Sequence, residues 1–172
     1  MMEKITYSSD EGFTFEELLE AAKIAEKYFE LEDNPEMMQA SDENIKYIYD
    51  NLHDFLNIIK VNNKVVGSTF IFPCSEKQMS KFISKKISEA ELFEDIMNKP
   101  ITNFSALYLA GATITPEYRR KGLAFQGFKK TIEKVKTRKI TKLLYWPLLE
   151  AGERLCRKIA ETTKLPLIKR NP

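Results

Sequence analysis

Two stretches in the first third of the chain repeat hydrophobic residues at helical spacing. The first begins after Thr14, which together with Glu17 matches the capping-box pattern of a helix start. Its apolar positions are Phe15, Leu18, Leu19, Ala22, Ala25 and Phe29. The second begins near Ser41, and its apolar positions are Ile45, Ile48, Tyr49 and Leu52. This spacing predicts two amphipathic helices, and residues 4–7 before them are a candidate strand.

The pattern then changes to runs rich in Val, Ile and Phe at residues 55–61 and 64–72. Asn62-Asn63 between them suits a two-residue turn, so the segment predicts an antiparallel hairpin that ends at Pro73. Ser75-x-x-Gln78 and Ser88-x-x-Glu91 are two further capping boxes. They predict a short helical insertion before Pro100, which is a candidate lid.

Residues 101–115 contain no acidic or basic side chain, as expected of a strand buried on both faces of a sheet. A helix opening near Gly122 follows, then a strand at 141–147, a helix at 149–163 and a Pro-containing edge strand at 165–169. No repeat or flexible linker divides the chain. We therefore expect one mixed α/β domain over residues 1–172.

Composition narrows the functional classes. The 172 residues include two cysteines, Cys74 and Cys156, with no CxxC pair, which favours buried reduced thiols over a zinc site. His53 is the only histidine, so Ser-His-Asp, Cys-His and HExxH chemistry are improbable. Because cysteine and histidine do not cluster, we expect no metal cofactor. No membrane-length apolar run and no signal-peptide pattern occur, so we expect a cytoplasmic protein.

Charge is distributed unevenly along the chain. Residues 1–60 hold 5 Lys and Arg against 15 Asp and Glu, a net charge of −10, whereas residues 61–172 hold 22 against 10, a net charge of +12. Charged helix faces exposed to solvent explain this uneven distribution of charge about as well as a functional role does.

The segment at residues 114–124, Ile-Thr-Pro-Glu-Tyr-Arg-Arg-Lys-Gly-Leu-Ala, joins the expected buried strand to a helix start. The first turn of a helix leaves backbone N–H groups unpaired and carries a partial positive charge, so it can hold a phosphate. Gly122 lets a ligand approach the backbone, and Arg119, Arg120 and Lys121 add positive charge. The segment is therefore a candidate site for a nucleotide-like polyanion.

This segment resembles the acetyl-CoA-binding signature of the GNAT superfamily of N-acetyltransferases, Q/R-x-x-G-x-G/A. Arg119, Gly122 and Ala124 occupy its three fixed places. The predicted order of elements is similar to the GNAT fold over nearly the whole chain, apart from the helical insertion. The GxGxxG and GxxxxGK[ST] nucleotide motifs are absent.

The resemblance implies where acetyl-CoA binds. Its pantetheine should follow the backbone of Ala112, Thr113 and Ile114. Its pyrophosphate should lie on the backbone N–H groups of Arg120, Lys121, Gly122, Leu123, Ala124 and Phe125. In the family the central strand and its next neighbour splay apart, which frees a backbone N–H that can stabilise an oxyanion.

The catalytic positions depart from the family pattern. Alignment of the final helix puts Leu149 where the family often has asparagine and Cys156 where it has the tyrosine that reprotonates the thiolate. Cys156 is thus a candidate acid, although a core thiol is the commoner explanation. Tyr145 and Glu150 are weaker candidates, because strand aromatics usually pack in cores and exposed carboxylates are usually solvated or ion-paired.

The function expected from the sequence is direct transfer of an acetyl group from acetyl-CoA to a primary amine. Because the resemblance places the first two helices beside the acceptor, their acidic excess favours a cationic acceptor. The alternative is a non-catalytic CoA or acyl-CoA sensor on the same fold, favoured by the missing tyrosine. We expect neither a nucleic-acid nor a membrane partner, because the basic excess lacks interleaved aromatics. The sequence sets no expectation for oligomeric state.

Overall fold

The computed structural model describes residues 2–99, 102–136 and 139–171. Its centre is a six-stranded sheet in the order β1-β2-β3-β4-β5-β6. The strands are β1 Ile5–Tyr7, β2 Leu56–Val61, β3 Lys64–Cys74, β4 Ala106–Ile114, β5 Lys142–Tyr145 and β6 Leu167–Lys169. The first four strands pair antiparallel, whereas β5 lies parallel to β4 and β6 lies parallel to β5. The expected mixed α/β class is confirmed.

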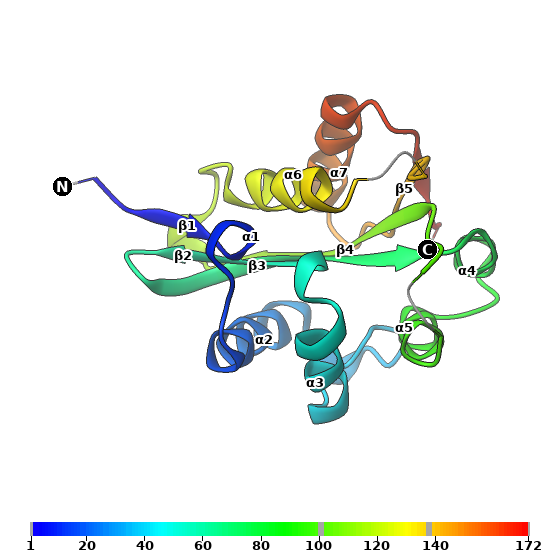
Figure 1. Ribbon diagram of the computed structural model, residues 1–172, viewed down its shortest axis with the longest axis horizontal. Coiled ribbons are helices and arrows are strands. Elements are labelled where there is room, and N and C mark those ends of the chain that lie inside the picture. The colour runs from blue at the N-terminus through cyan, green and yellow to red at the C-terminus, as the bar shows by residue number, and fades with distance from the viewer. Residues whose placement is uncertain (1, 100–101, 137–138, 172) are drawn as a thin grey trace.

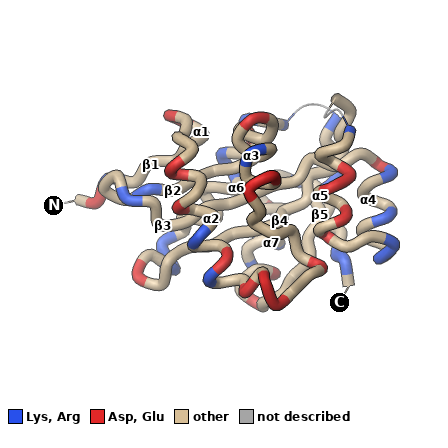
Figure 2. The backbone as a smooth tube through the Cα atoms, turned by 90° about the horizontal axis from the view of Figure 1, so that it is seen from below, with Lys and Arg blue, Asp and Glu red and all other residues tan. Residues whose placement is uncertain are grey.

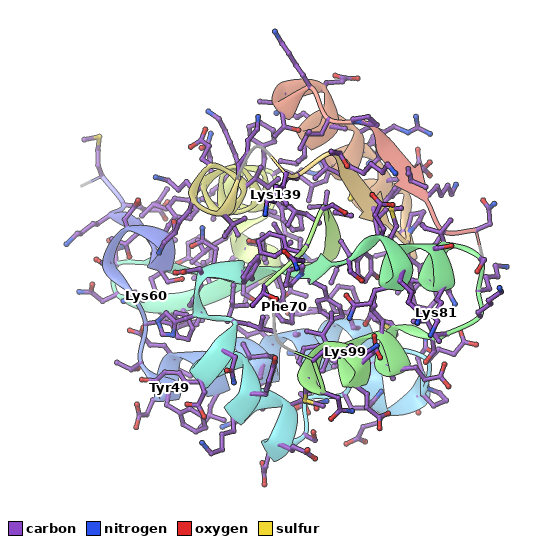
Figure 3. The ribbon with its side chains drawn as sticks, turned by 45° about the vertical axis from the view of Figure 1, so that its right-hand side comes forward. Tyr49, Lys60, Phe70, Lys81, Lys99 and Lys139 are labelled. Atoms are coloured by element: carbon purple, nitrogen blue, oxygen red, sulfur yellow. The ribbon has the colours of Figure 1, made fainter. Side chains whose placement is uncertain are left out.

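Helices cover both faces of this sheet (Figure 1). One layer holds α1 Ser8–Glu11, α6 Leu123–Val135 and α7 Glu150–Thr163, and the other holds α2 Phe15–Phe29, α3 Asp42–Asn51 and α5 Glu89–Met97. The remaining helix, α4 Glu76–Ile83, lies beside the end of β3 near α5. Phe70 of β3 lies near the middle of the molecule, with the rings of Phe72 and Phe93 5.0 and 6.3 Å away (Figure 3). Two helical layers thus bury the middle of the sheet.

Local sequence signals account for several element boundaries. Thr14, Ser75 and Ser88 each cap a helix through a complete capping box, as expected. Asn62 and Asn63 both have positive φ angles, 50° and 67°, as a two-residue hairpin turn of this kind requires. The short helix α1 was not predicted, because four residues are too few to show a helical period.

Some predicted boundaries were wrong. The strand predicted at 101–115 is the shorter β4, and the strand predicted at 141–147 ends at Tyr145. Pro73 does not end its strand, since β3 continues to Cys74 and Pro73 pairs with Leu107 of β4. The pairing of β2 with β3 stops at Phe70, so Pro73 lies where β3 has a single neighbour and proline is tolerated. Pro100 and Ile101 lie outside the described residues.

The helical insertion packs into the core, which weighs against its acting as a lid. Phe82 of α4 and Leu92, Phe93 and Ile96 of α5 are at most 2% exposed. The ring of Phe82 lies 4.7 Å from that of Tyr108 of β4, and the ring of Phe93 lies 5.2 Å from that of Phe72 of β3. Lifting the insertion would expose these side chains at about 1.5–3 kcal/mol each, which argues against easy opening.

The helices of the described ranges include none that is long and apolar enough to cross a membrane. The cytoplasmic location stays a prediction.

Candidate functional site

Strands β4 and β5 part in the middle of the sheet. They pair only where Ala106, Leu107 and Tyr108 face Lys142, Leu143 and Leu144. Beyond Tyr108, β4 runs on to Ile114 beside β3 alone, and the register with β3 shifts between Phe70 and Ile71, which leaves Ala110 as an extra residue. Such a bulge bends a strand and disturbs its ladder. The edge of β4 at residues 109–114 is therefore unpaired on its β5 side.

This edge leads into the start of α6. Within the described part of the chain, the backbone N–H groups of residues 120–125 donate no hydrogen bond, and the first bond of the helix runs from Gln126 N to Gly122 O at 3.1 Å. Gly122 caps the helix with φ 75° and no side-chain cap, and a Cβ placed there would meet nothing within 4 Å. No acidic residue lies in the first turn of α6. The junction thus presents free N–H donors and positive potential to an anion.

Arg119 shapes this junction. Its Nε donates to the carbonyl oxygen of Ile114 at 2.9 Å, and its guanidinium lies 4.9 Å from the ring centre of Tyr28 on α2. The side chain therefore ties the end of β4 to the loop and to the opposite helical layer. Lys121 pairs with Glu3 at 3.3 Å, whereas Arg120 makes no ion pair with a described residue.

The remaining residues expected at the cofactor site fall along the same path. Ala112, Thr113 and Ile114 end β4, and Arg120 has a φ of 62° that helps to turn the loop. Leu123 is buried and anchors α6, while Ala124 and Phe125 are half-buried. All ten expected cofactor residues lie between residues 112 and 125, at the end of β4, in the following loop and at the start of α6. Their contact with acetyl-CoA stays a prediction.

Tyr145, at the end of β5, contacts α7. Its hydroxyl donates to Glu153 Oε1 at 3.2 Å, and the same oxygen accepts from Arg157 at 3.0 Å and from Lys169 at 3.4 Å. Burial and the Glu153 charge raise the pKa of Tyr145, and the bond from Arg157 is the main reason that the pKa of Glu153 is lowered. Glu153 is therefore a charged anchor. Glu150, by contrast, is highly exposed and pairs with Arg154 at 2.8 Å.

Cys156 lies on the inner face of α7. Its side chain is buried, and burial raises the pKa of the thiol to about 12. A thiol with that pKa is a weaker acid than an ordinary thiol at about 8.5, so its environment favours packing over proton donation.

A buried carboxylate lies against the central strand on the opposite face. Glu89, at the start of α5, accepts hydrogen bonds from the Tyr108 hydroxyl at 2.6 Å and from the Met38 N–H at 2.9 Å. Burial raises the pKa of Glu89, and its hydrogen bonds and the charge of Arg170 oppose that rise. Tyr108 is the last residue of β4 that pairs with β5. Glu89 could not be singled out from the sequence, because this residue comes from the insertion and not from the segment that carries the motif.

Acidic residues surround the end of α2. A cavity of about 460 Å³ there is lined by Glu26, Glu30, Glu32 and Asp33 together with Leu31, Lys23 and Lys27. Phe29 contacts β4 near the bulge, since a Cβ on Gly111 would lie 3.8 Å from its ring. Figure 2, seen from the side of α2 and α3, shows acidic positions on both helices among fewer basic ones. The acidic excess of the first 60 residues thus includes a group gathered around the end of α2.

No group of three or more potential metal ligands occurs among the described residues. Two buried charged residues escaped the sequence reasoning. Glu89 accepts a hydrogen bond from Tyr108 of β4, and the Arg170 N–H donates to the carbonyl of Tyr145 at the end of β5. Neither lies in a local motif. A buried charge is revealed only by its tertiary neighbours.

No family model matches the sequence, and no curated protein matches it significantly. Solved structures do match the fold. One is the diaminobutyrate acetyltransferase of Paenibacillus lautus in complex with L-2,4-diaminobutyric acid and coenzyme A, with a TM-score of 0.62 and 13% identity over 96% of this chain and 80% of that one. Another is an aminoglycoside acetyltransferase from an uncultured soil metagenomic sample, solved with trehalose, with a TM-score of 0.53 and 13% identity over 94% and 87%.

A third is a predicted acetyltransferase of Clostridium acetobutylicum in complex with acetyl-CoA, with a TM-score of 0.52 and 14% identity over 91% of this chain and 88% of that one. At such identities the likeness concerns the fold. The chain therefore has the fold of the GNAT acetyltransferases.

Proposed function

We propose that the protein transfers an acetyl group from acetyl-CoA directly to a primary amine. The observation that carries this proposal is the junction of the unpaired β4 edge with the unbonded N–H groups at the start of α6. The acetyl-CoA and diaminobutyric acid complexes of structures with this fold are consistent with it.

The chain's own groups have distinct parts in this reaction. The N–H groups of residues 120–125 and the side chain of Arg120 hold the pyrophosphate, and the backbone of Ala112 to Ile114 orients the pantetheine. A β4 N–H beyond Tyr108 stabilises the oxyanion that forms when the amine nitrogen, having first lost its ammonium proton to water, attacks the thioester carbonyl carbon. The C–S bond then breaks, the amine loses a proton, and the thiolate gains one.

The acceptor should be cationic before reaction, because residues 1–60 carry a net charge of −10 and the cavity at the end of α2 is lined by more acidic than basic residues. We expect polyamines, aminoglycosides and lysine-like amines to be acetylated faster than glutamate-like amines of similar size. Rising salt should weaken the preference, since it screens exposed charges. The measurement is the rate of CoA release on matched amine panels at two ionic strengths. Faster turnover of acidic acceptors would contradict this assignment, and so would a preference that salt does not change.

A second candidate function is a CoA sensor, favoured by the buried Cys156 where the resemblance expects a tyrosine. In that case wild-type protein binds CoA tightly but acetylates no amine of the panel, and only Cys156→Tyr gains activity.

We expect Cys156→Ser and Cys156→Ala to change turnover less than about threefold, because the high pKa of the thiol makes it a poor acid. Their expected effect is on stability, through a buried hydroxyl or a small cavity. Steady-state kinetics and CoA titration separate these effects. A loss of turnover of about a hundredfold in Cys156→Ser, with CoA affinity retained, would instead make Cys156 the acid.

A further inference from the structure

Arg119 lies in the turn between the two segments that are expected to contact acetyl-CoA. Residues 112–114 at the end of β4 come before the turn, and residues 120–125 at the start of α6 follow it. Between them the chain makes a single 3₁₀ turn, Pro116–Tyr118. The Arg119 Nε donates to the carbonyl oxygen of Ile114 at 2.9 Å and so spans the whole turn. The relative position of the two segments therefore depends on the conformation of one side chain.

Tyr28 contacts this side chain from the opposite helical layer. It lies near the end of α2, on the face of the sheet that is opposite to α6 (Figure 1). Its half-buried ring has its centre 4.9 Å from the guanidinium carbon of Arg119, within the range of a cation–π interaction. The next residue, Phe29, contacts β4, since a Cβ on Gly111 would lie 3.8 Å from its ring. The end of α2 thus contacts both β4 and the turn that follows it.

The partners of the Arg119 charge are neutral. One of its five N–H donors bonds to a carbonyl oxygen, and no carboxylate of the described residues forms an ion pair with it. Arg119 is exposed, and an exposed arginine loses much rotamer freedom when it is held in one conformation. A ring against the face of the guanidinium favours the conformation that places Nε on Ile114. Lys27 also lies near the ring, at 5.5 Å, but it precedes Tyr28 in α2 and does not link the helix to the turn.

An ordered turn matters for a ligand that contacts both segments at once. In the proposed complex, residues 112–114 meet the pantetheine and residues 120–125 meet the pyrophosphate of the same molecule. If the turn between them were disordered in the free protein, part of the binding energy would be lost in ordering it. A turn that is already fixed avoids this loss, so the contacts that fix it contribute to CoA affinity without touching CoA.

We propose that Tyr28 is a positioning residue for the cofactor, because its ring holds Arg119 in the conformation that joins the end of β4 to the start of α6. This inference rests on the proposed acetyl transfer and adds to it a residue of α2, far in sequence from the cofactor segment. Tyr28 acts through Arg119 and does not itself contact acetyl-CoA. The aromatic ring carries this role, and the hydroxyl group has no part in it.

Titration calorimetry with CoA tests the role of the ring. Tyr28→Leu should weaken CoA binding at least about threefold, which is within the range of a cation–π interaction at an exposed site. Tyr28→Phe should bind CoA as wild type does, because it keeps the ring. Phe15→Leu is the matched control, since it removes an aromatic ring from the first turn of the same helix, where that ring packs on Tyr49. It should leave CoA affinity unchanged, and thermal unfolding shows whether the two leucine variants differ in stability.

A double-mutant cycle tests the dependence on Arg119. Arg119→Met removes the charge and the Nε donor but keeps a long side chain, and it should weaken CoA binding. Adding Tyr28→Leu to this variant should cause no further loss. A further threefold loss would overturn the proposal, because Tyr28 would then act independently of Arg119. Unchanged affinity in Tyr28→Leu would also overturn it, and so would an equal loss in Tyr28→Phe.

An NMR titration of wild-type protein needs no variant. The ring signals of Tyr28 should shift saturably with CoA, because the turn that holds Arg119 meets the ligand, whereas those of Phe15 should not. No shift at Tyr28 would overturn the proposal even if Tyr28→Leu fails to fold. If wild-type protein does not bind CoA, the proposed acetyl transfer and this inference both fail. If wild type and Tyr28→Leu bind CoA equally well, only this inference fails.

Discussion

Replacing Gly122 with aspartate is expected to weaken CoA binding at least about tenfold, about 1.4 kcal/mol, while the protein stays folded. The new carboxylate would lie beside the free N–H groups at the start of α6 and compete with the pyrophosphate for them. It has room, because a Cβ at this position meets nothing within 4 Å. The loss of affinity should therefore come from charge and not from a clash.

The matched control is Gly122→Asn. Asparagine and aspartate are similar in shape, and both tolerate the positive φ of 75° better than most residues, so backbone strain is nearly equal in the two variants. Titration calorimetry with CoA should place the asparagine variant near wild type and the aspartate variant well below it. Equal affinities in the two variants would show that the start of α6 does not hold the phosphate.

Gly67→Ala should lower the free energy of unfolding by about 3 kcal/mol or more, the upper range for overpacking. The added Cβ would lie 2.0 Å from the Thr113 carbonyl oxygen and 3.0 Å from the Ile114 Cα, both backbone atoms of β4. Strands β3 and β4 would have to separate at the segment expected to carry the pantetheine. CoA affinity should therefore fall together with stability.

Gly152→Ala on α7 is the control, because its Cβ meets nothing within 4 Å and alanine favours a helix by about 0.5–1 kcal/mol over glycine. Denaturant unfolding of both variants and wild type measures the difference. If Gly67→Ala is as stable as Gly152→Ala, the close approach of β3 to β4 is not as described.

Elements with strong local signals were predictable from the sequence. The capping boxes at Thr14, Ser75 and Ser88 and the Asn62-Asn63 turn depend on a few neighbouring residues, so their geometry follows from short-range chemistry. The ends of β4 and β5 could not be predicted from neighbouring residues. A strand ends where its partner leaves, and the partner of β4 is more than thirty residues away in sequence.

In the candidate site, too, the features that depend on neighbouring residues were predictable and those that depend on distant residues were not. The cofactor segment was predictable because a strand, a basic loop, Gly122 and a helix start are consecutive in the chain. The Glu89–Tyr108 bond joins residues 19 positions apart, and the bond from Arg170 to Phe82 joins residues 88 apart. Both depend on how the insertion packs on the sheet. Sequence periodicity indicates that α4 and α5 are helices, but not which polar groups they bury.

The most direct test of the account is an NMR titration of isotope-labelled wild-type protein with CoA, following the backbone amide signals. We expect saturable shifts that are largest for the amides of residues 120–125, with smaller ones for Ala112 to Ile114 of β4, because those groups would meet the pyrophosphate and the pantetheine. Saturable shifts confined to other parts of the chain, or no saturable shift at all, would contradict it.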